Sequence, residues 1–389
     1  MDKLRIKNFR CFKDTGEINL APITFLVGEN SSGKTSFLAG YQYIHKFLSG
    51  MPEVSFNTPP FNLGDPEQIL CRGAKEILFQ VRWTIKKNDS PRRIRKSANE
   101  FGKRGATEKD ANFGIDTSLA TLDGELLVTS LDVAMPSGKL RVTEDRTGKK
   151  KQVRLSYSPQ SKSGKEFLEK INGEKISIHA MMFNIWEVFS PYLERLARGL
   201  ESDGKKVFTK IEAIAKAQQA DKIFEELGQM MRSERWGELF AFSPVRSKPE
   251  RFYQHGDIVS RSAEGEHISR ALYDLFVRES TAKYAKSFVA ELANFGLETG
   301  LFSEIDIRRL GNQSFDPYQI LVVPHENSAA ESLVDVGYGV SQILPIVSEI
   351  LDMRRRGPVT FLIQQPEVHL HPRAQAALTT FFYRIHQKT

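Results

Sequence analysis

The sequence predicts an α/β protein with a mixed sheet, an antiparallel β subdomain and a helical insertion lobe. An apolar run at 23–27, a glycine-rich turn and a helix through about Leu48 form a strand–turn–helix unit. Between residues 119 and 158, alternating runs are broken by Asp-Gly, Ser-Gly and Thr-Gly, which is typical of hairpins. Over 165–236, apolar residues recur every three or four positions, as on amphipathic helices.

Other segments fill in this fold. Residues 4–9 alternate like a half-buried strand, and 17–20 is its expected partner. Residues 52–64 are rich in proline, asparagine and glycine and are expected to be a loop. The runs 77–85 and 318–323 are expected to be strands.

The chain of 389 residues is long enough for two or more lobes. We expect an N-terminal lobe at 1–160, a mainly helical insertion at 161–300 and a C-terminal lobe at 301–389. The hydrophobic content is 40% and the charged content 26%, which is ordinary for a globular protein. No apolar run is long enough to span a membrane and no signal peptide is evident, so we expect a cytoplasmic protein without membrane partners.

Cysteine chemistry is not expected to define this protein. The two cysteines, Cys11 and Cys71, form no C-x-x-C pair, which argues against a disulfide framework, a cysteine zinc site or a zinc-hook dimer. A metal site at His369 and His371 is disfavoured, because a His-Leu-His-Pro segment before a helix more often serves packing and capping.

The strand–turn–helix unit contains the pattern G-x-x-x-x-G-K-[ST] at 28–35, a phosphate-binding P-loop. In such a loop, backbone N–H groups at a helix N-terminus face the phosphates. Lys34 is expected to reach the β- and γ-phosphates, and the Thr35 hydroxyl to hold Mg²⁺. The expected nucleotide-binding residues of this segment are Gly28, Asn30, Ser31, Ser32, Gly33, Lys34, Thr35 and Ser36.

Two further segments match nucleotide motifs. The apolar run Val359–Ile363 ends in Gln364-Gln365-Pro366-Glu367, the form of a Walker B strand whose polar end holds Mg²⁺ and activates water. Before it, Asp335–Leu344 is a glycine-rich turn that opens a helix.

Together with Ile6–Phe12, these motifs resemble prokaryotic AAA-type, ABC/SMC-like P-loop ATPases. The set is similar to the ATPase portion of the overcoming-lysogenization-defect (OLD) family and to Septu-type anti-phage defence ATPases. The segment Phe242–Tyr253 adds to the likeness, whereas residues 86–235 match poorly. The resemblance implies an ABC/SMC-like head, ATP rather than GTP, and a role in defence with a nuclease partner.

The resemblance also implies a composite site. In such ATPases two subunits enclose two nucleotides, and each signature helix points at the γ-phosphate on the partner's P-loop. Gly339 and Ser341 are the expected contacts made in trans, in a homodimer or higher oligomer. Arg10 is expected near the nucleotide, although a surface arginine is nearly as good an interpretation.

The usual acidic pair of Walker B is replaced by two glutamines. An amide cannot accept a proton from water and can only orient the water, so we expect slow hydrolysis. The expected catalytic residues are Gln365, Glu367 and Lys34, and the expected metal ligands are Thr35 and Gln364.

The chain ends at Thr389 without the switch histidine of these relatives, so we expect that region to come from a longer chain or from a partner. No TOPRIM-like nuclease cluster is evident, although Asp306 follows Glu304 by two residues. The expected nuclease is therefore a separate partner.

Net charge is +7, and cations gather at 86–104 and 139–154, both expected to be loops or hairpin tips. Such segments could track DNA phosphates or simply be solvated. Three functions therefore remain open. They are an ATPase that dimerises on nucleotide and regulates a nuclease, a DNA-repair ATPase that clamps DNA itself, and a pseudo-ATPase scaffold.

Overall fold

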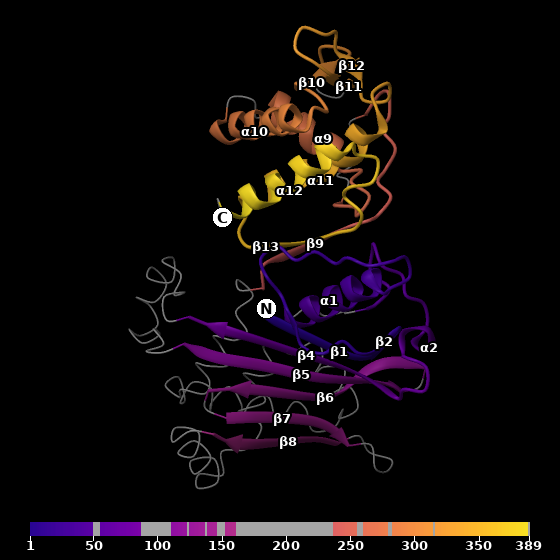
Figure 1. Cartoon of the computed structure of the whole chain (residues 1–389), viewed down its shortest axis with the longest axis vertical. Coiled ribbons are helices and arrows are strands. Elements are labelled where there is room, and N and C mark those ends of the chain that lie inside the picture. The colour runs from indigo at the N-terminus through magenta and orange to yellow at the C-terminus, as the bar shows by residue number, and fades with distance from the viewer. Residues whose placement is uncertain are drawn as a thin grey trace. The chain divides into compact units, whose positions relative to one another are not determined.

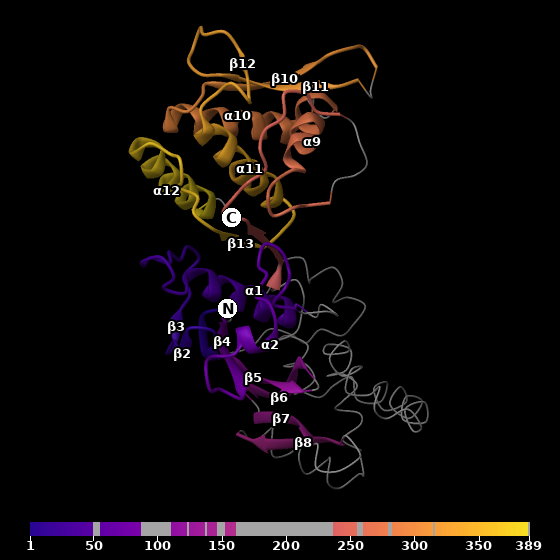
Figure 2. The ribbon, with the colours of Figure 1, turned by 90° about the vertical axis from the view of Figure 1, so that its right-hand side faces the viewer.

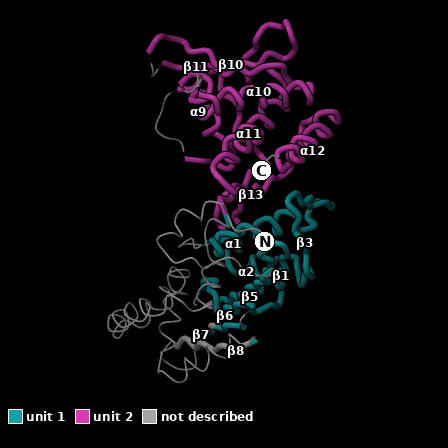
Figure 3. The backbone as a smooth tube through the Cα atoms, turned by 90° about the vertical axis from the view of Figure 1, so that its left-hand side faces the viewer, with its two compact units in different colours: residues 1–56, 63–236 teal, residues 57–62, 237–389 magenta. Residues whose placement is uncertain are grey.

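The computed structural model describes residues 1–49, 55–86, 110–122, 124–136, 138–145, 152–160, 236–254, 260–278, 282–313 and 316–387. The chain divides into two compact units (Figure 3). Unit 1 comprises residues 1–56 and 63–236, and unit 2 comprises 57–62 and 237–389. Residues 237–300, expected in the insertion, thus belong to the same unit as the C-terminal lobe. The helices expected between 165 and 235 lie outside the described residues.

Unit 1 is built on an antiparallel sheet, as the sequence predicted (Figure 1). The strands run in the order β2-β1-β4-β5-β6-β7-β8, and β3 also pairs with β1. Their bounds are β1 Lys3–Phe9, β2 Phe12–Asp14, β3 Ile18–Asn19, β4 Glu76–Ile85, β5 Ala111–Leu122, β6 Glu125–Met135, β7 Gly138–Asp145 and β8 Gln152–Pro159. The strands expected at 4–9, 17–20 and 77–85 and the hairpins after 119 are confirmed.

Strict alternation makes this sheet two-faced. Along β4 every second side chain is buried, and the buried set of Ile77, Phe79, Val81, Trp83 and Ile85 continues on neighbouring strands. Helix α1 (Lys34–Leu48) packs on this apolar face. Its Gly40 allows the approach, since a Cβ there would lie 3.0 Å from Ile6 Cδ1. The helix that carries the P-loop lysine is thereby fixed to a rigid base.

The strand expected at 23–27 is wrong. These residues form no strand in the structure, and Phe25 and Val27 are 61% and 93% exposed. No described strand pairs with the segment. An apolar run becomes a strand only where another strand offers a free edge, so β propensity alone did not decide the outcome.

The basic segment at 139–154 is not simply a loop. Its described residues are mostly in strands β7 and β8, which pair antiparallel from Gly138–Pro159 to Asp145–Gln152. The buried carboxylate of Asp132 on β6 binds both Lys139 and Arg141, at 2.9 and 2.6 Å. Residues 146–151 lie outside the described part, as does all of 86–104 except Lys86.

Unit 2 surrounds one hydrophobic core to which most of its helices and strands contribute. The described helices and strands of unit 2 are β9 Glu238–Phe242, α9 Ile268–Tyr273, a π-helical turn η1 Asp274–Arg278, α10 Lys283–Thr299, β10 Glu304–Arg309, β11 Tyr318–Val323, β12 Glu331–Ser332, α11 Tyr338–Met353, β13 Val359–Ile363 and α12 Pro372–Gln387. Within the unit, α10, α11 and α12 lie between the β10-β11-β12 sheet and the β9–β13 pair (Figure 2). The strands expected at 318–323 and 359–363 are confirmed.

The two-stranded sheet of unit 2 is parallel. Val359–Ile363 of β13 pairs in register with Glu238–Phe242 of β9. Together with the antiparallel sheets, this pair makes the fold a mixed α/β one, as predicted. Among the described residues, no helix is both long and apolar enough to cross a bilayer.

Candidate nucleotide site

The P-loop residues form an uncapped helix N-terminus in unit 1. Gly33 is the N-cap of α1 and adopts φ 99° and ψ 4°, a left-handed conformation that favours glycine. No side chain caps the helix and its first turn contains no acidic residue. The first N–H groups of a helix lack partners within it, and the helix dipole makes this end positive. The end of α1 is therefore suited to an anion such as phosphate.

Lys34 lies over the loop that precedes it. Its ammonium group donates to the carbonyl oxygens of Gly28 and Glu29, each at 2.7 Å. The loop itself is tight, since Ser31 has φ 63° and Ser32 N–H bonds Glu29 O at 3.3 Å. An ammonium held at the rim of an uncapped helix end adds a mobile positive charge to the dipole of the helix.

The turn between β1 and β2 packs against the P-loop. A Cβ on Gly33 would lie 2.7 Å from both Cys11 Sγ and Phe12 Cζ, so only glycine fits there. Arg10 belongs to this turn, with φ 50° and its N–H bonded to Ile69 O at 2.8 Å. The structure thus brings the turn that carries Arg10 beside the phosphate loop, while contact between Arg10 and nucleotide remains a prediction.

The remaining P-loop candidates differ in exposure. Asn30, Ser31, Ser32 and Thr35 are exposed, whereas Ser36 is buried in the first turn of α1. A glycine is favoured at position 28 for a steric reason, because a Cβ there would lie 2.7 Å from Ser32 Oγ. Thr35 is thus placed where a hydroxyl could reach a metal ion beside a bound phosphate.

The end of the Walker B strand lies in unit 2, and its two glutamines differ. Gln364 is 8% exposed, and its amide nitrogen donates to Phe242 O of β9 at 3.2 Å. Gln365 is exposed and has φ 47°, an uncommon conformation for a residue other than glycine. Glu367 is exposed as well. The two proposed catalytic side chains are accessible, while the proposed metal ligand is turned toward β9.

The side chain of Ser341 and the backbone of Gly339, two residues of the signature segment, make packing contacts within unit 2. Ser341 is 5% exposed and its hydroxyl donates to Tyr338 O at 2.9 Å. A Cβ on Gly339 would lie 2.8 Å from His369 O, so this glycine allows α11 to approach the segment that follows Walker B. The ring of Tyr338 meets that of His369 edge-on, with centroids 4.7 Å apart. Direct contacts of Gly339 and Ser341 with a nucleotide remain predictions.

Two arginines that sequence reasoning did not single out belong to this region. Arg246, only 2% exposed, donates to the carbonyl oxygens of Gln364 and Gln365 at 2.7 and 3.3 Å. Arg251 forms a two-pronged pair with Asp335, at 2.9 and 2.7 Å, and thereby lowers the pKa of that carboxyl group. The available signal was the Phe242–Tyr253 segment, in which Arg246 lies between two prolines and Arg251 follows the second.

The C-terminal half of α11 is held by a separate buried network. His267 Nδ1 accepts from Ser262 N–H at 3.1 Å, so its Nε2 carries the proton that it donates to Glu349 at 2.9 Å. Arg261 adds an ion pair to Glu349 at 3.1 Å. The signature helix is therefore anchored at both ends, by Arg246 near its start and by this network further along.

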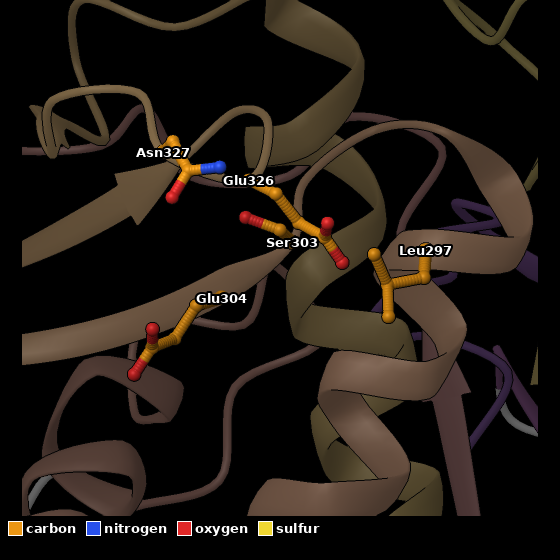
Figure 4. Close-up of a pocket in the computed structure, with 5 residues that line it drawn as sticks. All are labelled: Leu297, Ser303, Glu304, Glu326 and Asn327. Atoms are coloured by element: carbon orange, nitrogen blue, oxygen red, sulfur yellow. The ribbon is translucent and has the colours of Figure 1, made fainter.

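The described residues offer no alternative functional site in the form of a metal cluster, and the pocket that the structure shows lies outside the nucleotide motifs. In the described part of the chain, no group of three or more His, Cys, Asp or Glu side chains could hold a metal ion. His371 Nδ1 instead accepts from Arg373 N–H at 3.5 Å, which fits a capping role. A pocket in unit 2 is lined by Leu297, Ser303, Glu304, Glu326 and Asn327 (Figure 4). None of these five belongs to the P-loop, signature or Walker B segments.

Comparison with known proteins identifies the family. The model of the AAA ATPase domain family matches residues 1–389. The chain belongs to this family. Membership implies NTP hydrolysis, typically of ATP with Mg²⁺. The curated proteins include no match.

Among solved structures, the chain resembles the Smc head domain of Pyrococcus furiosus, which has an extended coiled coil and is bound to the C-terminal domain of ScpA. The alignment covers 100% of this chain and 87% of that one, with 12% identity and a TM-score of 0.34. The family assignment rests on the match to the family model.

Proposed function

We propose that this protein binds ATP with Mg²⁺ at the P-loop of unit 1 and hydrolyses it slowly. The observation that carries the proposal is the N-terminus of α1, which has no capping side chain and no acidic residue in its first turn, and which combines a left-handed Gly33 with the ammonium group of Lys34. Thr35 and Gln364 are the proposed residues for Mg²⁺. Bound Mg²⁺ supplies charge neutralisation at the β- and γ-phosphates.

Slow turnover is proposed from the side chains at the Walker B end. Gln365 is exposed and can orient a water molecule, but an amide has no basic site for its proton. Glu367 is exposed and could accept the proton, although Pro366 separates it from Gln365. A general base in place contributes about a hundredfold or more to such reactions, so its loss at position 365 predicts a long-lived ATP state.

We further propose that ATP drives dimerisation through composite sites. Signature helix α11 starts without a capping side chain or an acidic residue in its first turn, so its N-terminus could face the phosphate bound by a second copy. Because Ser341 is buried and bonded to Tyr338 O, the backbone of this turn is the better candidate for contact than the hydroxyl.

The proposed cellular role is regulation of a nuclease partner in anti-phage defence. This step is supported by the motif resemblance alone. Co-purification of a nuclease with the tagged protein, and nuclease activity that depends on ATP, would support it. A preparation active in ATP hydrolysis but without such a partner would contradict it.

DNA clamping by the chain itself is the second candidate. In the described part of the 139–154 segment, Lys139 and Arg141 share the single carboxylate of Asp132, which offsets one of their two positive charges and leaves less charge for phosphates. DNA binding titrated against salt, with and without ATP, decides between the two. An ATP-dependent affinity would favour the clamp, and its absence would exclude it.

The central test compares wild type with Lys34→Ala. MgATP binding is measured by calorimetry, and Lys7→Ala is the matched control because Lys7 pairs with Asp14 on the surface of the same unit. We expect Lys34→Ala to weaken binding about tenfold or more, as loss of a charged hydrogen-bond donor costs about 1.5–3 kcal/mol. Equal binding by both variants would refute the site. Binding without turnover would favour the scaffold function.

A further inference from the structure

Arg246 contacts two motifs that each lie more than ninety residues from it in the chain. Its guanidinium group donates to Gln364 O and Gln365 O, directly after β13. Its backbone N–H donates to Gln342 Oε1 in the first turns of α11, at 3.4 Å. One buried residue therefore contacts both the Walker B end and the start of the signature helix.

The contact with the Walker B end falls on a strained residue. Gln365 has φ 47°, and a left-handed conformation costs an ordinary residue about 1–2 kcal/mol. Such a conformation persists only where its surroundings determine it. The two carbonyl groups that Arg246 binds belong to the peptide bonds before and after the Cα atom of Gln365. The guanidinium group therefore holds the backbone on both sides of this residue. The direction of the Gln365 side chain depends on it.

The charge of Arg246 is not used in an ion pair. Among the described residues no carboxylate lies within ion-pair distance of it, and its remaining acceptor is Pro244 O at 3.2 Å. Burial lowers its pKa, while the carboxylate of Glu367 acts in the opposite direction. Burying an unpaired charge is costly, and a purely structural tie between carbonyls could be made by a neutral donor.

We propose that Arg246 is a positioning residue for nucleotide hydrolysis, which aims Gln365 while it ties the Walker B end to the signature helix. The proposal rests on the proposed function, since Gln365 and Glu367 are its catalytic candidates. It adds that a change at either motif is transmitted to the other through this residue, whose side chain binds the Walker B end and whose backbone N–H binds the signature helix. An allosteric contact between the Walker B end and the dimerising helix would follow.

The test uses Arg246→Lys and Arg246→Met in the full chain. Lysine keeps the charge but cannot bind two carbonyl groups as a planar fork. Arg261→Met is the control, because Arg261 is a partly buried arginine that binds the other half of α11 through Glu349. We expect both Arg246 variants to bind MgATP within about threefold of wild type and to lose about tenfold or more in kcat per bound nucleotide. The Arg261 variant is expected to melt earlier with kcat unchanged.

Hydrogen exchange provides a readout that does not depend on hydrolysis. If Arg246 couples the two motifs, amides of 364–370 and of 338–343 exchange faster together in Arg246→Lys, by about tenfold. Should wild type bind no ATP, the proposed function falls while this measurement still judges the coupling. Unchanged exchange in both segments, or kcat lowered equally by Arg261→Met, would overturn the proposal.

Discussion

Gly33→Ala is the sharpest perturbation of the phosphate loop. A methyl group there would lie 2.7 Å from Cys11 Sγ and Phe12 Cζ, closer than van der Waals contact allows. The backbone adds a second cost, because φ 99° lies outside the left-handed well that other residues tolerate. We expect about 1–2 kcal/mol from the backbone and about 1–3 kcal/mol from overpacking, so about 2–5 kcal/mol in all.

Gly16→Ala separates these two terms. Gly16 belongs to the same unit and has φ 66°, but a Cβ there would meet nothing within 4 Å. Unit 1 can be followed by tryptophan fluorescence during urea unfolding, because residues 237–389 contain no tryptophan and Trp83 and Trp236 are buried in unit 1. We expect Gly33→Ala to cost about 1–3 kcal/mol more than Gly16→Ala and to weaken MgATP binding as well. Equal losses in the two variants would refute the steric argument.

Three further predictions concern the same residues and their neighbours. Cys11 is exposed and Cys71 is buried, so an alkylating reagent should label Cys11. Saturating MgATP should slow this labelling about tenfold. An unchanged labelling rate would mean that bound nucleotide does not shield Cys11. Burial lowers the pKa of His45 to about 4 from an ordinary 6.5, so as pH falls between these values the unfolded state takes up a proton that the folded state excludes. Stability of unit 1 should fall by about 3 kcal/mol over that window, and His45→Gln, which can still donate to Trp236 O, should flatten the profile seen by fluorescence. Gln365→Glu should raise kcat about tenfold or more in a phosphate-release assay; an unchanged rate would mean that this position does not address the water.

Much of the framework could be predicted because local patterns and tertiary packing agree there. The burial of strand β4 alternates without exception, and every second side chain from Ile77 to Ile85 is buried. The P-loop spacing, the glycine at the start of α1 and the helix that follows are likewise local features. The prediction of a strand at 23–27 was wrong, because the conformation of this segment depends on a partner strand that its own residues do not specify.

The candidate site was predictable in its P-loop and less so at its other end. Gln364 and Gln365 are identical in the sequence, yet one bonds β9 and the other is exposed in a left-handed conformation. Gly339 matched a nucleotide motif, but its close approach to His369 O gives it a packing role as well. No motif predicts the role of Arg246, because its guanidinium group binds backbone carbonyl groups, which any residue type supplies.

The backbone contacts of Arg246 change the meaning of the glutamine pair. If Gln365 were merely an inactive relic of an acidic residue, nothing would require its peptide to be held in a conformation that costs free energy. A buried arginine that has no ion-pair partner among the described residues and that fixes this peptide is a second cost at the same place. Because two unfavourable features are maintained side by side, we infer that the Gln365 side chain has a defined orientation. We therefore infer that slow hydrolysis is the working rate of this site, so that the lifetime of bound ATP, and with it of the proposed dimer, is set by how Arg246 aims one amide.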